Sequence, residues 1–188
     1  LASKNSNNGS FTSGTKTYYW RDAYGSDNAY FQYSLEVDKS NKNYLFVRYW
    51  GSDGSFTKNN VNYTRDFYIY IDDNKLVEQT LNNEKMNNAY DVFYEIPEEY
   101  TKGKDSVTVK FAPKSSTNCA GGVIEARITN DDLKCVKITA DYNDNGTLKD
   151  SSIEKISIED IKQTENSSSH KEFYWESTDN MKPIITEE

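Results

Sequence analysis

The sequence predicts an all-β protein, a β-sandwich followed by a small β module. Three observations lead to this prediction. Apolar residues recur with a period of two along most of the 188-residue chain, clusters of Asp, Asn, Gly and Pro separate the short apolar runs, and no long stretch has helical periodicity. Many short strands divided by turn-forming clusters are typical of a two-sheet sandwich.

The expected strands follow one another at short intervals. Phe31–Val37 alternates apolar and polar residues, as a half-buried strand does, whereas Leu45–Trp50 is the more continuous apolar run of a central strand. The other expected strands are Phe67–Ile71 and Leu76–Leu81, joined as a hairpin by an Asp/Asn turn, then Asp91–Ile96, Val107–Phe111 and Val123–Ile128. Only Pro97–Gly103 suggests a helical turn.

A polar break at residues 129–132 divides the chain. We expect the sandwich to span residues 10–131 and the appended β-rich module to span residues 132–188. The first ten residues are rich in Asn and Ser, which predicts a frayed N-terminus. Beyond the break, Cys135–Ala140 alternates again and begins the second unit.

The charge balance excludes some partners. Thirty Asp and Glu against 22 Lys and Arg give a formal net charge of −8. Phosphate and anionic lipid both require clustered basic residues, so we expect no nucleic acid and no membrane as partner. An acidic surface is compatible with a neutral ligand such as a polysaccharide. No stretch approaches the ~20 apolar residues of a membrane span, and we expect any signal peptide to lie outside this sequence.

The catalytic and redox residues are few. His170 is the one histidine and lies in a polar tract, and no Ser/His/Asp or Cys/His set accompanies it. Pairs of carboxylates are available anywhere in so acidic a chain, so they do not identify a glycosidase. Cys119 and Cys135 can be a disulfide or two free thiols, and both alternatives stay open. We therefore expect a non-catalytic protein.

One motif resembles a metal-binding loop. Asp141-x-Asn143-x-Asn145-Gly146 matches the opening of a calcium loop, but Ser152 stands at the twelfth position and no helices flank the motif. An Asn-Asp-Asn-Gly run is also a good hairpin turn, and we favour that interpretation. We name no metal ligands and expect no required cofactor.

An ordered set of short motifs resembles a known family. The motifs are Trp20–Ala23, Tyr30–Tyr33, Tyr44-Leu45, Tyr49–Asp53, Arg65–Asp72, Ile96–Glu99, Lys102–Val109 and Ala120–Val123. Together they resemble the accessory C-terminal β-sandwich of β-L-arabinofuranosidase-type glycoside hydrolases, over roughly residues 18 to 128.

The resemblance has several implications. It implies a galactose-binding-like jelly roll, a fold that many carbohydrate-binding modules share, in a secreted (extracellular) bacterial glycoside hydrolase whose catalytic domain is a separate barrel. It also implies polysaccharide or oligosaccharide and the attached catalytic domain as partners, and a structural calcium ion is a further expectation. The sequence departs from the pattern by a longer insertion at Ser55–Thr64.

A second stretch, Phe173–Ile184, is similar to the ending of small β modules in clostridial and ruminococcal secreted enzymes. Tyr142 and Gly146 fit the opening turn of such modules. The resemblance implies no activity for this unit.

Three predicted loops combine aromatic and polar residues, as carbohydrate sites do. These are Tyr18–Tyr24, Trp50–Phe56 and Ser116–Asn118, which we expect to meet at one end of the sandwich. The expected carbohydrate-binding residues are Trp20, Arg21, Asp22, Tyr24, Trp50, Asp53 and Asn118. The alternative interpretation makes Trp20 and Trp50 core rings, and Arg21 and Asp22 a structural salt bridge.

Two functions follow from these observations. The first is a carbohydrate-binding module that holds plant cell-wall or related polysaccharide near a catalytic domain. The second is a structural accessory that packs on that domain and stabilises it without binding sugar, because interdomain contacts also favour Tyr and Trp.

Overall fold

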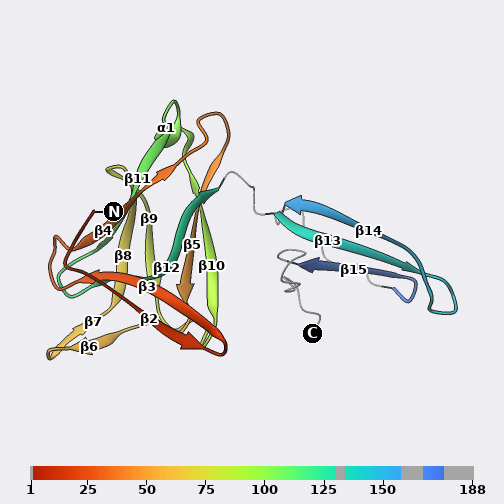
Figure 1. Cartoon of the computed structure of the whole chain (residues 1–188), viewed down its shortest axis with the longest axis horizontal. Coiled ribbons are helices and arrows are strands. Elements are labelled where there is room, and N and C mark those ends of the chain that lie inside the picture. The colour runs from red at the N-terminus through yellow and green to blue at the C-terminus, as the bar shows by residue number, and fades with distance from the viewer. Residues whose placement is uncertain (1, 130–133, 158–166, 176–188) are drawn as a thin grey trace. The chain divides into compact units, whose positions relative to one another are not determined.

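The computed structural model describes residues 2–129, 134–157 and 167–175. The chain forms two compact units, residues 1–130 and 131–188, and each is described by itself (Figure 1). The domain boundary that the sequence predicts near Asp132 lies outside the described residues. Among the residues that the structure describes, no helix is both long and apolar enough to cross a membrane.

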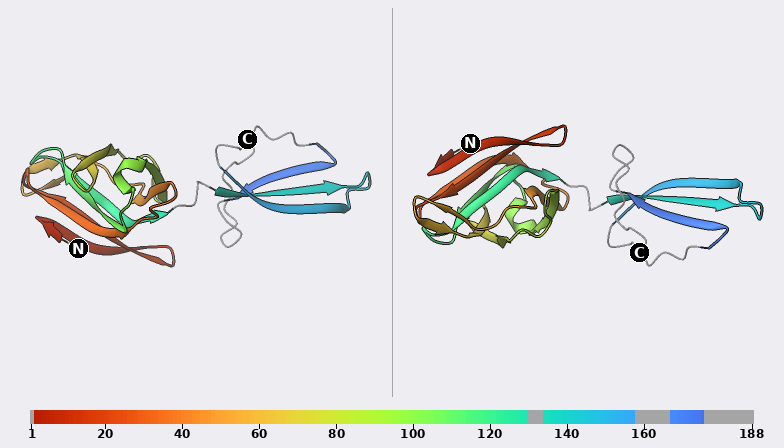
Figure 2. Two further views of the ribbon diagram at one scale, coloured as in Figure 1. Left: turned by 90° about the horizontal axis from the view of Figure 1, so that it is seen from above. Right: turned by 90° about the horizontal axis from the view of Figure 1, so that it is seen from below.

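The N-terminal unit consists of two five-stranded antiparallel sheets, seen as facing layers in Figure 2. The first sheet has the order β1-β4-β11-β8-β9, made by Ala2–Lys4, Tyr30–Glu36, Ser106–Pro113, Arg65–Ile71 and Asn74–Leu81. The second has the order β10-β5-β12-β3-β2, made by Ala89–Ile96, Asn43–Trp50, Cys119–Thr129, Lys16–Tyr24 and Ser6–Ser13. From β3 to β5 and from β9 to β12 the chain passes repeatedly between the sheets. The predicted all-β jelly-roll sandwich is confirmed.

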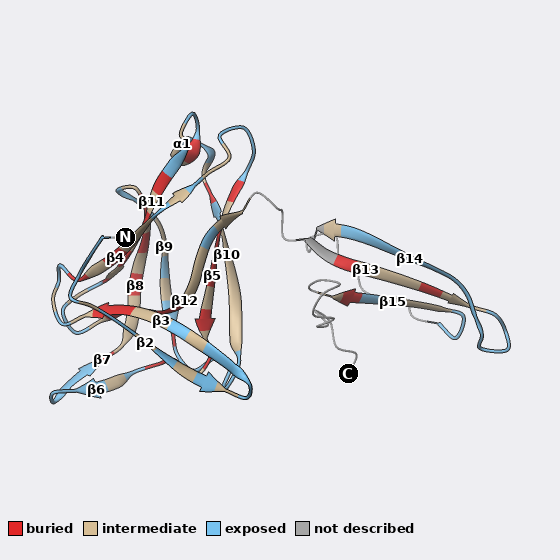
Figure 3. Cartoon of the chain, in the orientation of Figure 1, coloured by how far each residue is buried: buried red, intermediate tan, exposed pale blue. Residues whose placement is uncertain are grey.

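The hydrophobic core lies between the two sheets (Figure 3). Along β5, Leu45, Val47 and Tyr49 are fully buried in it, because alternate side chains of a strand point to the same face. From the opposite sheet, Phe31 and Phe111 stack with ring centroids 4.9 Å apart. The neighbours of the core residues on the second sheet therefore point to the outer face of that sheet.

The predicted fraying of the N-terminus is wrong. Ala2–Lys4 pairs with β4, and Ser6–Ser13 pairs along β3 from Ser6↔Ala23 to Ser13↔Lys16. The polar composition of this segment suits an edge strand, whose backbone gains hydrogen bonds while its side chains face water. The sandwich therefore begins before residue 10.

Two predicted loops are regular structure. Tyr18–Tyr24, expected as a loop, belongs to strand β3. The insertion at Ser55–Thr64 contains a small hairpin formed by β6 (Phe56–Lys58) and β7 (Val61–Tyr63). The helical turn predicted after Pro97 is confirmed as α1, which spans Glu98–Thr101.

The C-terminal unit contains a three-stranded antiparallel sheet in the order β14-β13-β15, made by Leu148–Ser157, Lys134–Tyr142 and His170–Trp175. The predicted hairpin turn between β13 and β14 is confirmed, since Asn143 and Thr147 form a hydrogen bond across it and Gly146 has a φ of +79°.

The first residue of the motif that resembles a calcium loop has a protein partner. Asp141 pairs with His170 on β15, and Oδ1 of Asp141 lies 2.6 Å from Nδ1 of His170. No cluster of three or more His, Cys, Asp or Glu side chains suited to a metal ion occurs within the described ranges. Most of the Phe173–Ile184 motif lies outside those ranges.

Candidate functional site

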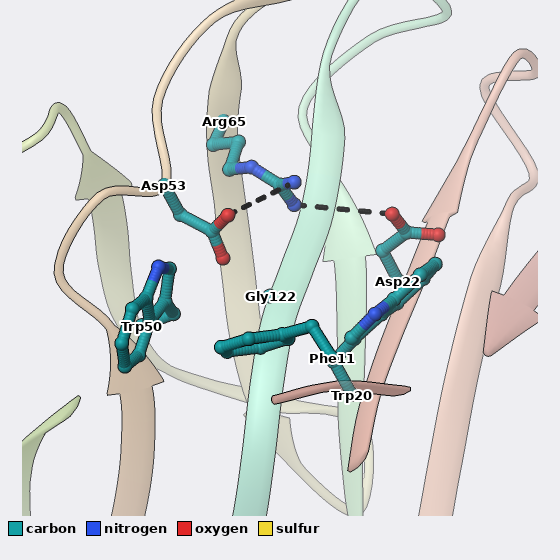
Figure 4. A pocket seen from close by; sticks show the side chains of 7 residues that line it. All are labelled: Phe11, Trp20, Asp22, Trp50, Asp53, Arg65 and Gly122. Carbon is teal, nitrogen blue, oxygen red and sulfur yellow. Dashed lines mark ion pairs between the residues drawn. The ribbon is translucent and has the colours of Figure 1, made fainter. Parts of the chain in front are cut away.

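A pocket with a cavity volume of about 220 Å³ lies on the N-terminal unit (Figure 4). Its lining is three aromatic rings, two carboxylates, one guanidinium and one glycine, contributed by Phe11, Trp20, Trp50, Asp22, Asp53, Arg65 and Gly122. Four of the seven belong to the expected carbohydrate-binding residues.

Strand alternation places most of these side chains on the outer face of the second sheet. Tyr49 and Ala23 are core residues, so their chain neighbours Trp50 and Asp22 point away from the core. Trp20 is two residues from Asp22 on β3 and shares its face. The pocket therefore lies on a sheet face, whereas the sequence predicts a site among loops.

The aromatic rings pack against one another. The Phe11 ring meets Trp50 edge-on, with centroids 4.7 Å apart, and stacks on Tyr18 at 5.3 Å. Trp20 lies over Gly9 of the paired strand β2, where a Cβ atom would come within 2.7 Å of Cζ2 of the indole. Trp20 and Trp50 are both half-buried, so each ring combines packing contacts with exposed surface.

Arg65 connects the two carboxylates. Its Nη2 lies 3.3 Å from Oδ1 of Asp53, and its Nη1 lies 3.9 Å from Oδ2 of Asp22 (Figure 4). The guanidinium also packs 5.2 Å from the Phe56 ring and donates from Nη1 to Sγ of Cys119 at 3.6 Å. Arg65 is the first residue of β8, in the opposite sheet, and reaches the pocket at the end of the sandwich.

Turn and bulge geometry hold Asp53 in place. The Asp53 N–H donates to the Trp50 carbonyl at 3.0 Å, and the Asn83 N–H donates to the Asp53 carbonyl at 2.8 Å. The Asp53 carboxylate packs against Gly122, which has a φ of +79° in an irregular part of β12. A Cβ atom at Gly122 would lie 1.8 Å from Oδ2 of Asp53, so this approach requires glycine.

Burial changes the titration of both acids. Loss of solvent raises the pKa of Asp22 above its usual value, an effect that Arg65 and a hydrogen bond from Asn7 oppose. Desolvation likewise raises the pKa of Asp53 against the attraction of Arg65. The pocket thus holds two partly desolvated carboxylates around a single guanidinium.

Arg21, Tyr24 and Asn118 do not line the pocket. Arg21 follows Trp20 on β3 and donates from Nη1 to Oγ of Ser6 at 3.3 Å, so the alternative of an Arg21–Asp22 salt bridge is wrong. The alternation of β3 separates Arg21 from its two neighbours.

The other two residues have structural contacts. Tyr24 packs against Phe56 and Tyr63 of the insertion hairpin, and its hydroxyl accepts a hydrogen bond from Lys58 at 2.6 Å. Asn118 donates to Oγ1 of Thr64 at 2.7 Å. Their roles in sugar binding remain predictions, and neither residue lines the pocket.

Three lining residues are absent from the sequence prediction. Phe11 directly follows the polar first ten residues and was not assigned to any predicted strand or loop, and Arg65 is 43 positions from Asp22 in the chain. Gly122 had a usable signal, because the Gly121-Gly122 pair interrupts an otherwise regular strand and indicates a bulge or a close approach.

The sandwich and its pocket define a β-sandwich module with an aromatic, acidic site on one sheet face. The chain belongs to DUF6805, a family of unknown function, whose family model matches residues 1–129. No curated protein matches the chain. Among solved structures the chain is similar to a family 35 carbohydrate binding module from an environmental isolate, with 14% sequence identity and a TM-score of 0.42 over 58% of this chain and 71% of that one.

Cys119 is a free cysteine, fully buried on β12. Burial raises the pKa of its thiol to about 12, despite the nearby Arg65. A thiol in this state packs as a small apolar group and does not act as a nucleophile.

Proposed function

We propose that the N-terminal unit is a carbohydrate-binding module that holds plant cell-wall or related polysaccharide near the catalytic domain of a secreted bacterial glycoside hydrolase. The observation that carries this proposal is the pocket in which Trp20 and Trp50 stand beside Asp22 and Asp53. Aromatic rings pack against the apolar face of a sugar, and carboxylates accept hydrogen bonds from its hydroxyls.

The chemistry of the lining supports a binding role. Both carboxylates share one guanidinium, which holds them as fixed hydrogen-bond acceptors. In the glycoside hydrolases that the sequence resembles, the catalytic residues belong to another domain.

Affinity gel electrophoresis tests this function directly. The whole chain is run through gels that contain arabinan, arabinoxylan, xylan, pectin, galactan or β-glucan. Retardation in at least one gel supports a binding module and identifies its substrate class. Duplicate gels with calcium and with chelator test the predicted structural calcium, since retardation that chelator abolishes requires a metal.

The structural accessory remains the second candidate, and exposed apolar side chains favour it. Tyr19 is 71% exposed and Met86 is 59% exposed, and neither lines the pocket. Such residues are suited to contact with an attached domain. Absence of retardation in every gel, together with a higher melting temperature when the separate catalytic domain is added, would favour this candidate over sugar binding.

A further inference from the structure

We propose that the pocket selects sugars by charge, so that it accepts neutral sugar units and rejects uronic acids. This inference rests on the proposed function and specifies its substrate class. It comes from the charges around the cavity, in which Asp22 and Asp53 face a single cation, Arg65.

All three charged side chains are largely shielded from solvent. The exposed fraction is 7% for the Asp22 side chain, 20% for Asp53 and 13% for Arg65. Two ionised carboxylates and one guanidinium give the lining a net charge of −1. A sugar carboxylate in this pocket would be a third anion beside one cation, in surroundings where solvent screens charge poorly.

The hydrogen-bonding groups of the pocket agree with this charge. Ionised carboxylates only accept hydrogen bonds, and the hydroxyls of a neutral sugar can donate them. Both terminal nitrogens of Arg65 already lie against protein groups, with Nη2 beside Asp53 and Nη1 beside Asp22 and Cys119. The third guanidinium nitrogen, Nε, is buried and inaccessible to a ligand. A uronate would therefore meet two acceptor carboxylates beside a guanidinium that these carboxylates already engage.

Two neighbouring features bear on this charge. The faces of aromatic rings carry the negative part of the ring quadrupole, so Trp20 and Trp50 favour C–H groups over anions. Lys58 is the basic group that also acts on the charge of Asp22, but its ammonium is held by the Tyr24 hydroxyl and is not part of the lining.

The test compares polymers that differ only in charge. Galactan and β-glucan are each used before and after oxidation of their primary hydroxyls to carboxylates. Gels are run in 0.15 M salt, where the Debye length of about 8 Å screens the net charge of the whole protein. The wild type is compared with Asp53→Asn and Asp22→Asn. Asp73→Asn is the matched control, because it removes the same charge from a fully exposed side chain outside the pocket.

We expect the wild type to be retarded by a neutral polymer and to bind its oxidised form at least about tenfold more weakly. Asp53→Asn or Asp22→Asn should recover part of the affinity for the oxidised polymer, and Asp73→Asn should not. Equal or tighter binding of the oxidised form, or identical behaviour of all three variants, would overturn the inference and leave the binding function intact. No retardation by any neutral or oxidised polymer would overturn the proposed function, and the inference with it.

Discussion

Gly122 and the carboxylate of Asp53 lie so close together that a methyl group on Gly122 would force them apart. A Cβ atom at Gly122 would lie 1.8 Å from Oδ2 of Asp53, and the φ of +79° is itself unfavourable for other residues. The bulge in β12 thus sets the position of one of the two pocket carboxylates.

Gly122→Ala should therefore disturb both stability and binding. We expect a loss of about 2–4 kcal/mol in the free energy of unfolding, from backbone strain and overpacking, and loss of sugar affinity as Asp53 is displaced. Urea denaturation and affinity gels measure the two effects. Gly103→Ala is the control, since Gly103 has a φ of +72° with nothing within 4 Å of its Cβ position. Equal effects of both substitutions would show that strain alone is responsible and that the Asp53 contact is unimportant.

Asp22 should make the protein less stable as the pH rises. Desolvation raises the pKa of Asp22 in the folded state above the unfolded value of about 3.9. The stabilisation of the fold that comes from this shift is therefore present below the unfolded pKa and is lost as the pH rises through the folded pKa. Asp22→Asn removes this dependence. We expect the stability of the variant relative to wild type to increase from pH 4 to pH 7, as measured by urea denaturation.

Asp72 provides a control, because its pKa is shifted in the opposite direction from that of Asp22. Burial alone would raise the pKa of Asp72, but hydrogen bonds from Lys104 and the Thr108 N–H outweigh burial and lower it. The contribution of Asp72 is present above the unfolded pKa and is lost as the pH falls. Relative to wild type, Asp72→Asn should therefore gain stability toward low pH. The same pH trend in both variants would contradict the assigned environments.

Removal of residues 1–9 should destabilise the sandwich and weaken the pocket. This deletion removes β1 and the half of β2 that pairs with Trp20–Ala23, including Gly9 beneath the Trp20 ring and Asn7, which donates to Asp22 at 3.3 Å. We expect a lower urea midpoint and weaker sugar binding. An unchanged midpoint would mean that the N-terminal strands contribute nothing to the fold.

Cys119 should react with thiol reagents only when the protein unfolds. Its side chain is fully buried and its pKa is about 12, so almost no thiolate is available at pH 8. The reaction with Ellman's reagent is followed in a Cys135→Ser variant, which isolates the Cys119 signal. Rapid labelling under native conditions would contradict the burial of this thiol.

The fold was more predictable from the sequence than the site. The alternating runs at Phe31–Val37 and Val107–Phe111 are strands because one face of each is buried. Edge strand β2 lacks this pattern, because its polar side chains face water and only its backbone pairs with β3. Its sequence therefore did not predict a strand.

The site shows a similar limit. Period-two alternation along β3 would have grouped Trp20 with Asp22 and excluded Arg21, had this segment been predicted as a strand. The contribution of Arg65 could not be predicted, because it depends on how the end of β8 meets the opposite sheet. Local patterns identify which residues share a face of one strand, and only the packing of the two sheets joins Arg65 to Asp22 and Asp53.

The most direct test of sugar binding compares Trp20→Ala with Tyr19→Ala. The two residues are neighbours on β3, but Trp20 lines the pocket, whereas Tyr19 does not line it and is 71% exposed. Isothermal titration calorimetry with the polymer that retards the wild type most should show a loss of about tenfold or more for Trp20→Ala and no change for Tyr19→Ala, with both variants unfolding cooperatively. Unchanged affinity in Trp20→Ala, or an equal loss in both variants, would contradict the assignment of this pocket as the carbohydrate site.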